Sequence, residues 1–226
     1  MMAFSLIFRG DPWLAPAAEP DLAIVHVIDD DASLRFALDS LFRSVGLAVR
    51  TYGTPREFLD ADRGSQPGCL VLDVRLPGVN GLDFQDQINR LGIHLPVVFM
   101  TGHGDIPMSV RGMKAGAVDF LAKPFRDQDM LDAVTTAIER DRERQGAAAA
   151  ADALRSRYET LSPREQQVMA LVTAGRLNKQ AAGDLELSEI TVKIHRGAAM
   201  RKMGARTLPD LVRMAEALQV KPDQSR

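Results

Sequence analysis

The sequence predicts an α/β domain built on a parallel sheet, followed by a smaller all-α domain. Short apolar runs alternate with helix-like segments from residue 22 to about residue 140, and only helix-like segments follow residue 160. Near-continuous apolar strands with helices between them are typical of a parallel sheet covered on both faces. Five strand–helix units indicate a doubly wound sheet with the strand order 2-1-3-4-5.

The strands of the first domain are runs rich in branched and aromatic residues. The expected strands are 22–28, 47–52, 69–73, 96–101 and 118–121. The expected helices are 32–45, 55–62, 82–91 and 106–115, with a fifth beginning near Asp127. The second helix has a clear start signal, because Thr54-Pro55-Arg56-Glu57 is a capping box with proline at the first helical position.

A helical connector is expected to join the two domains. Met130, Val134 and Ile138 form one apolar stripe, and a charged run and five consecutive alanines follow it. Alanine has the highest helix propensity, so this segment should be a semi-rigid helix, with Gly146 as a break or hinge. The expected divisions are a disordered leader at 1–20, the α/β domain at 21–140, the connector at 141–160 and the all-α domain at 161–226.

The all-α domain is expected to contain a helix-turn-helix. Its predicted helices are 163–173, 178–185, 189–203 and 208–218. The first begins at a capping box, Ser162-Pro163-Arg164-Glu165, and Ser188 is placed to cap the third. The second and third helices, joined by a short turn, form the helix-turn-helix pair.

Charge is distributed unevenly between the two predicted domains. The formal net charge of −2 divides into about +4 for residues 163–226 and −6 for the rest. This asymmetry suits an acidic module joined to one that binds a polyanion. Cys69 is the single cysteine, so no internal disulfide can form and a reducing, cytoplasmic location is expected. No apolar stretch reaches the ~20 residues that span a bilayer, so no membrane is expected as a partner.

Polar residues gather at the ends of the predicted strands. Asp29 and Asp30 follow the first strand, Asp73 ends the third, Thr101 ends the fourth, and Lys123 lies just beyond the fifth. Ligand sites of open α/β sheets lie at the carboxyl ends of the strands, so these side chains should converge. Three carboxylates there would form a hard-cation site suited to Mg²⁺.

This arrangement resembles the receiver domain of two-component response regulators, which has a flavodoxin-like (CheY-like) fold. The resemblance implies that Asp73 accepts a phosphoryl group from a sensor histidine kinase, while Thr101 and Lys123 contact that group. It also implies Mg²⁺ binding by Asp29, Asp30, Asp73 and the backbone carbonyl of Arg75. Thr101 and Phe120 are then the switch residues, with a cis peptide bond before Pro124. The segment 76–81 is similar to the family's flexible loop.

The C-terminal motifs, Leu161-Ser162-Pro163-Arg164-Glu165 and Thr191-Val192-Lys193-Ile194-His195-Arg196, resemble the LuxR-type DNA-binding domain. Together with the receiver they resemble the NarL/FixJ class, and the FixJ branch most closely. Val192, His195, Ala199 and Met203 are expected to face the core. The predicted DNA-binding residues are Lys193 and Ile194 for base edges, Thr191, Arg196, Arg201 and Lys202 for the DNA backbone, and Gly197 on the same face.

The sequence departs from the family pattern at two positions that bear on DNA binding. Gly197 lies within the predicted recognition helix, where it costs ~1 kcal/mol relative to alanine and provides no side chain for a base. Glu186 occupies a turn in which the family often has glycine.

The resulting hypothesis is a phosphorylation-dependent transcription regulator. The resemblance implies a homodimer on phosphorylation, formed through the face that includes helix 106–115, strand 118–121 and the helix after Asp127. It also implies binding to two-fold operator DNA, contact with RNA polymerase and activation of transcription. An aspartate-nucleophile phosphatase is the enzyme alternative, but such enzymes place a second aspartate where this chain has Arg75. A receiver that only dimerises, without phosphorylation, is the third hypothesis.

Overall fold

A computed structural model describes residues 23–102 and 106–222, which form two compact units divided between Glu143 and Arg144. The predicted leader, residues 1–20, lies outside the described residues. Among the described residues, no helix is long and apolar enough to cross a membrane.

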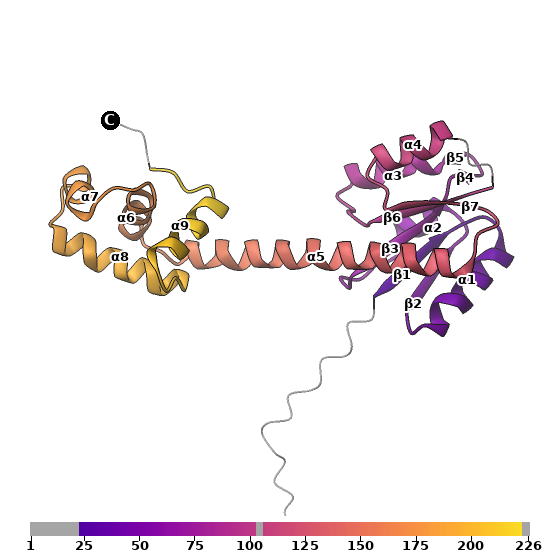
Figure 1. Ribbon diagram of the computed structural model, residues 1–226, viewed down its shortest axis with the longest axis horizontal. Coiled ribbons are helices and arrows are strands. Elements are labelled where there is room, and N and C mark those ends of the chain that lie inside the picture. Colours follow the sequence, from indigo (N-terminus) through magenta and orange to yellow (C-terminus); the bar gives the residue numbers. More distant parts are fainter. Residues whose placement is uncertain (1–22, 103–105, 223–226) are drawn as a thin grey trace, which may run out of the picture. The chain divides into compact units, whose positions relative to one another are not determined.

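The first unit is a five-stranded parallel sheet with helices on both faces (Figure 1). Its strands are β1 (Ile24–Ile28), β2 (Ala48–Tyr52), β3 (Gly68–Asp73), β6 (Val97–Thr101) and β7 (Asp119–Ala122). Their order in the sheet is β2-β1-β3-β6-β7, which confirms the predicted doubly wound topology. The helices are α1 (Ala32–Ser44), α2 (Pro55–Asp60), α3 (Gly81–Arg90), α4 (Ile106–Lys114) and α5 (Asp127–Glu159).

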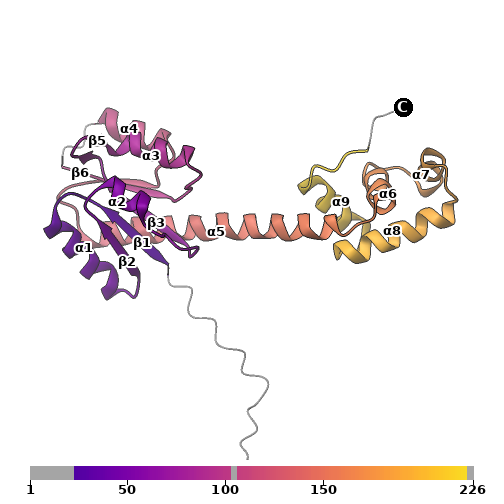
Figure 2. The ribbon, with the colours of Figure 1, turned by 180° about the vertical axis from the view of Figure 1, so that it is seen from behind.

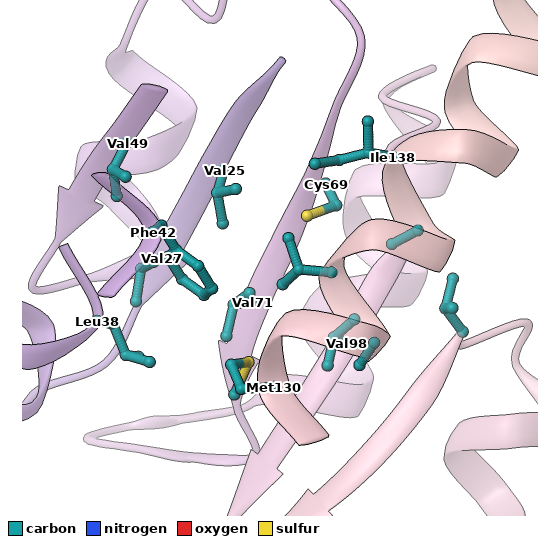
Figure 3. Close-up of a cluster of buried hydrophobic side chains, with 14 of the residues drawn as sticks. Val25, Val27, Leu38, Phe42, Val49, Cys69, Val71, Val98, Met130 and Ile138 are labelled. Atoms are coloured by element: carbon teal, nitrogen blue, oxygen red, sulfur yellow. The ribbon is translucent and has the colours of Figure 1, made fainter. Parts of the chain in front are cut away.

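Alternate residues of each strand pack into two cores, one on each face of the sheet. On one face, Val71 of β3 and its neighbours pack against α1 and the beginning of α5, through residues such as Phe42 and Met130 (Figure 3). On the other face, Leu72 packs with Phe58 of α2 and Phe84 of α3. Figure 2 shows α2 and the sheet from behind. Two-sided burial explains the continuous apolar runs in the sequence.

The helix beginnings carry the local signals that the sequence indicates. The Thr54 side chain accepts a hydrogen bond from the Glu57 N–H at the start of α2. At the start of α1 the Asp31 carboxylate accepts hydrogen bonds from the Ser33 and Leu34 N–H groups. Asp31 therefore has a structural role, and the other two carboxylates that follow β1, those of Asp29 and Asp30, remain for the site.

The segment after β3 is more regular than the predicted flexible loop. Strands β4 (Arg75–Leu76) and β5 (Val79–Asn80) form a short antiparallel hairpin, and Gly78 in its turn has φ +77°. The Asn80 side chain then accepts a hydrogen bond from the Leu82 N–H and begins α3. The sequence contains both signals, a Pro-Gly turn and an Asx cap.

Helix α5 is a single helix of 33 residues that passes through Gly146. The expected break at Gly146 was therefore wrong. A glycine within a helix costs only ~1 kcal/mol relative to alanine, and the alanine tract that follows offsets that cost through its high helix propensity.

Asp141 of α5 is fully buried although it belongs to the charged run of the connector. Its carboxylate accepts a hydrogen bond of 2.9 Å from the Gly68 N–H at the start of β3. The bond satisfies a backbone donor at the end of the sheet and fixes the helix against it. Cys69, also fully buried, lies next to this contact in the core (Figure 3).

His26 is buried in β1 in an aromatic cluster. Its Nδ1 lies 3.1 Å from the Tyr52 hydroxyl, and its ring meets Phe58 edge-on. Burial lowers the pKa of His26 to about 4, with help from the positive charges of Arg50 and Arg63.

This neutral histidine predicts a loss of stability in acid. The unfolded chain takes up a proton near pH 6.5 and the folded chain does not, so the free energy of unfolding should fall between pH 6.5 and about 4. The expected slope is about 1.4 kcal/mol per pH unit. Urea unfolding at several pH values should show this slope in the wild type and lose it in His26→Gln. The exposed His94 provides the control, because His94→Gln should keep the slope; equal slopes in all three proteins would contradict the prediction.

The second unit contains four helices around one small core. They are α6 (Pro163–Thr173), α7 (Asn178–Leu185), α8 (Glu189–Met203) and α9 (Leu208–Ala217), as the sequence predicts. Val168, Val192 and Leu211 are central to the core, and Leu154 and Tyr158 from the end of α5 pack against it. Ser162 and Glu165 form the predicted capping box, and Ser188 caps α8.

Glu186 ends α7 in the left-handed conformation, with φ +57°. Glycine adopts this conformation without steric cost, which is a physical reason for the glycine that the family often has at this turn. The glutamate of this chain adopts it at some cost.

Candidate functional site: an acidic pocket and an exposed helix

Three carboxylates meet at the carboxyl ends of β1 and β3. Oxygen atoms of Asp29, Asp30 and Asp73 all lie within 4.8 Å of one another. Asp29 and Asp73 are buried, whereas Asp30 is exposed and opens the cluster to solvent. The Asp73 Oδ1 atom accepts a hydrogen bond of 2.8 Å from the Arg75 N–H, and the Asp29 Oδ1 atom accepts one of 2.8 Å from the Asp31 N–H. Backbone donors thus fix both buried carboxylates.

Lys123 reaches into this cluster from just beyond β7. Its Nζ atom lies 2.6 Å from Asp29 Oδ2 and 2.5 Å from Asp73 Oδ2. Burial raises the pKa of the Asp29 carboxyl, against hydrogen bonds from Lys123 and Asp31 that lower it. Burial alone would lower the pKa of the Lys123 ammonium, but the hydrogen bonds and charges of the two carboxylates raise it overall. The ammonium is therefore held in its charged form.

Thr101 lies on β6, the strand next to that of Asp73, and Phe120 lies on β7, one strand further from Asp73. Thr101 is buried at the end of β6, and its carbonyl accepts a hydrogen bond of 2.7 Å from the Lys123 N–H. The Lys123–Pro124 peptide is cis, as the family resemblance implies. Phe120 of β7 is half-buried and lies 6.0 Å from the Phe99 ring, centroid to centroid.

Gly81 brings the start of α3 directly behind Asp73. A Cβ atom at this position would lie 2.5 Å from the Asp73 carbonyl oxygen and 2.9 Å from the Val74 Cα atom. The Gly81 N–H donates a hydrogen bond of 2.8 Å to the Val74 carbonyl. Only a residue without a side chain allows α3 to approach the carboxylate-bearing turn this closely.

In the second unit, α8 presents one face to its own core and the opposite face to solvent. Val192, Ala199 and Met203 are buried as expected, while His195 is only half-buried. Lys193, Ile194 and Arg201 are exposed on the other side. Ile194 is 64% exposed, which is unusual for a large apolar side chain and marks this face as a contact surface.

Two positively charged side chains of α8 already make contacts within the second unit. Lys202 Nζ lies 2.6 Å from Glu165 Oε2 and 3.1 Å from the Thr160 carbonyl oxygen. Arg196 donates a hydrogen bond of 3.1 Å to the Asn178 side chain on α7. These two side chains stabilise the fold of the second unit in addition to any role on its surface.

Comparison with known proteins decides the family. Residues 25–135 match the response regulator receiver domain, and residues 159–215 match the LuxR family of bacterial regulatory proteins. The chain is 60% identical over 196 residues to nodulation protein W of Bradyrhizobium diazoefficiens, covering 87% of this chain and 86% of that protein. The chain is a response regulator with a LuxR-type helix-turn-helix domain.

Two further relatives agree with this assignment. The response regulator is 43% identical over 203 residues to the transcriptional regulatory protein FixJ of Azorhizobium caulinodans, covering 90% of this chain and 96% of FixJ. The solved structure of the response regulator StyR is 45% identical, with a TM-score of 0.77, and the match covers 86% of this chain and 98% of StyR. Membership in this family makes the chain a transcription regulator rather than a conventional enzyme.

The acidic pocket of the response regulator fits Mg²⁺ by the chemistry of its donors. Hard divalent cations take oxygen ligands, and three carboxylates converge here with one face open to solvent. The pocket is typical of the Mg²⁺ site of receiver domains.

Two residues, Asp141 and Ile190, and one contact of Lys202 were absent from the sequence predictions. Asp141 lies three residues after Ile138 on the apolar stripe of α5, but its burial depends on the distant Gly68 N–H. Ile190 is 71% exposed one turn before Ile194, so the contact face of α8 is longer than the sequence predicted. The bond of Lys202 to Glu165 joins separate helices and had no local signal.

Lys202 should therefore contribute to the stability of the response regulator without DNA. Lys202→Met leaves the poorly exposed Glu165 without its cation, and we expect a loss of about 1 kcal/mol. Hydrogen exchange of the α6 amides should show protection reduced by roughly 5-fold, since each 1.4 kcal/mol is a factor of ten. Lys179→Met, which changes another exposed lysine, should have no effect; unchanged α6 protection in Lys202→Met would refute the stabilising role.

Proposed function

We propose that this response regulator controls transcription in a phosphorylation-dependent way, with Asp73 as the phosphoryl acceptor. One observation supports this most strongly: the Asp73 carboxylate, at the end of the central strand, lies within 4.8 Å of two other carboxylates and 2.5 Å from the Lys123 ammonium. The receiver domain implies a histidine kinase as the phosphoryl donor.

Asp29, Asp30, Asp73 and the Arg75 carbonyl would hold Mg²⁺. When bound, the ion supplies positive charge that offsets repulsion between the carboxylates and an incoming phosphoryl group. Asp73 makes the new bond: a carboxylate oxygen bonds to phosphorus while the bond from phosphorus to the kinase imidazole nitrogen breaks. Lys123 lies close enough to pair with the phosphoryl oxygens, and the Arg75 N–H orients the attacking carboxylate.

Phosphorylation of Asp73 would change the conformation of the receiver through Thr101 and Phe120. The Thr101 hydroxyl donates to a phosphoryl oxygen, and Phe120 repacks on the strand beside it. The half-buried state of Phe120 suits a ring with two packing positions, and phosphorylation favours one of them. Dimerisation then uses the face of α4, β7 and α5, on which Val110 and Met113 are exposed. Ala117, between α4 and β7, is buried and belongs to the core.

The output of the switch would be operator binding by α8 in the major groove. Lys193 and Ile194 lie on its exposed face and are positioned to read base edges, while Thr191 and Arg196 contact phosphates. We propose activation of transcription through RNA polymerase as the result; the name of one relative, transcriptional regulatory protein FixJ, supports a role in transcription. We also propose a cytoplasmic location, and the family assignment supports it, because response regulators are typically cytoplasmic.

Phosphate-affinity electrophoresis tests the acceptor. With a small acyl phosphate and Mg²⁺, the wild-type protein should form a retarded band, and Asp73→Asn should not. A band that persists in Asp73→Asn would assign the modification to another residue. No band in either protein would favour the alternative of a receiver that only dimerises.

A further inference from the structure

Arg201 lies at the centre of the exposed face of α8. A helix turns by about 100° per residue, so Arg201 is about 180° from the buried Val192. Ile194 lies beside it at about 200°, whereas Arg196 and Lys202 are at the flanks, closer to the core. Of the cations on α8, Arg201 is therefore the one that points most directly away from the domain.

The Arg201 side chain lies over Gly197, where a Cβ atom would meet it at an ordinary van der Waals distance and only a longer side chain would displace it. Helical side chains lean toward the N-terminus of their helix, so Arg201 covers the residue four positions earlier. Its Nη1 atom lies 3.8 Å from the position that a Cβ of Gly197 would occupy. The guanidinium thus lies over Gly197, toward Lys193 and Ile194.

Arg201 is also the cation of α8 that remains available. Lys193 pairs with Glu189 at 3.4 Å, Arg196 with Asn178, and Lys202 with Glu165. Within the described parts of the chain, no hydrogen bond or ion pair engages the Arg201 side chain. A guanidinium that keeps all its donors can bind a ligand without first losing an internal partner.

We propose that Arg201 reads a guanine in the major groove, and that the lack of a long side chain at Gly197 keeps the space beneath its guanidinium open. This inference rests on the proposed DNA-binding function and replaces the sequence-based expectation that Arg201 contacts the DNA backbone. The planar guanidinium fork matches the O6 and N7 acceptors of guanine with two parallel hydrogen bonds in a fixed geometry, whereas a lysine ammonium donates to the same acceptors from a flexible stem. Beside it, exposed Ile194 suits apolar contact with a thymine methyl group.

The test begins with selection of a binding site from random double-stranded DNA by the full-length protein treated with phosphodonor. Each guanine of the selected half-site is then replaced by 7-deazaguanine, which lacks the N7 acceptor. One replacement should weaken wild-type binding by about 5- to 10-fold. Arg201→Ala should bind the native and the substituted site equally, and Arg201→Lys should recover only part of the discrimination, because its ammonium donates to N7 and O6 without the fixed guanidinium geometry.

Arg206→Ala is the matched control, because Arg206 is an exposed arginine outside α8. It should bind with the base preference of the wild type. Gly197→Leu provides an independent variant, since its side chain fills the space under the guanidinium. It should lose discrimination at the same guanine, and Arg201→Ala should then add little in the double variant.

The outcomes separate the two proposals. Suppose that the wild type selects a site and that Arg201→Ala keeps every base preference. If the variant only reduces the slope of log binding constant against log salt concentration by about one, Arg201 contacts a phosphate. That result overturns the guanine contact and leaves the DNA-binding function standing. If the wild type enriches no sequence, with or without phosphodonor, the proposed function fails and this inference fails with it.

Discussion

Asp73→Asn is expected to abolish the effect of a phosphodonor on DNA binding while leaving the fold intact. The substitution keeps the size of the side chain and the oxygen that accepts from the Arg75 N–H, but removes the nucleophilic charge. Binding of the selected operator, measured by fluorescence anisotropy, should tighten at least 10-fold with phosphodonor and Mg²⁺ in the wild type. The variant should show no change.

Asp60→Asn is a suitable control, because Asp60 is an exposed carboxylate on α2, outside the pocket. It should respond to the phosphodonor as the wild type does. If Asp73→Asn also gains affinity with phosphodonor, Asp73 is not the acceptor that drives the switch. If no protein responds, DNA binding is independent of phosphorylation and the receiver serves another purpose, such as dimerisation.

Gly81→Ala is expected to distort the receiver directly behind its acidic pocket. The added Cβ would lie 2.5 Å from the Asp73 carbonyl oxygen, and a backbone atom there cannot rotate away as a side chain could. Either α3 or the turn after β3 must move. We expect a loss of about 3 kcal/mol in the free energy of unfolding and a much slower phosphorylation of Asp73.

Gly146→Ala distinguishes this steric effect from a general response to replacing glycine. Gly146 lies in α5, and no described atom comes within 4 Å of its added Cβ. Alanine should stabilise the helix there by up to ~1 kcal/mol. Urea unfolding of both variants provides the comparison; a Gly81→Ala protein as stable as the wild type would show that α3 moves away at little cost.

The fold and the residues of the acidic pocket could be predicted from the sequence, because their signals lie within short segments of the chain. Four strands of the sheet have a polar or charged residue at their end or just beyond it, and parallel strands bring such ends together. Asp29, Asp73 and Lys123 could therefore be placed in one site without knowledge of their contacts. The helix boundaries followed from caps that act within three residues, such as Ser162 with Glu165.

The remaining features depend on contacts between distant parts of the chain. The charged run around Asp141 looks solvated, yet this one carboxylate meets a backbone N–H 73 residues away in sequence. Lys202 was assigned to DNA from its charge and position, but a fixed acid on another helix already holds its ammonium. Helix α5 continues through Gly146 because the helix propensity of the following alanines outweighs the cost of one glycine. The difference is about 1 kcal/mol, too small to be predicted from the sequence pattern.

The burial of Cys69 gives the receiver a built-in chemical reporter of its opening. Cys69 is the only cysteine of the chain, it is fully buried, and burial raises the pKa of its thiol. An alkylating reagent can modify it only in molecules whose sheet has separated from α5, so the labelling rate counts opening events. Since the second unit has no cysteine, a pulse of reagent followed by mass spectrometry follows receiver stability within the intact protein, without a mutation or an attached dye.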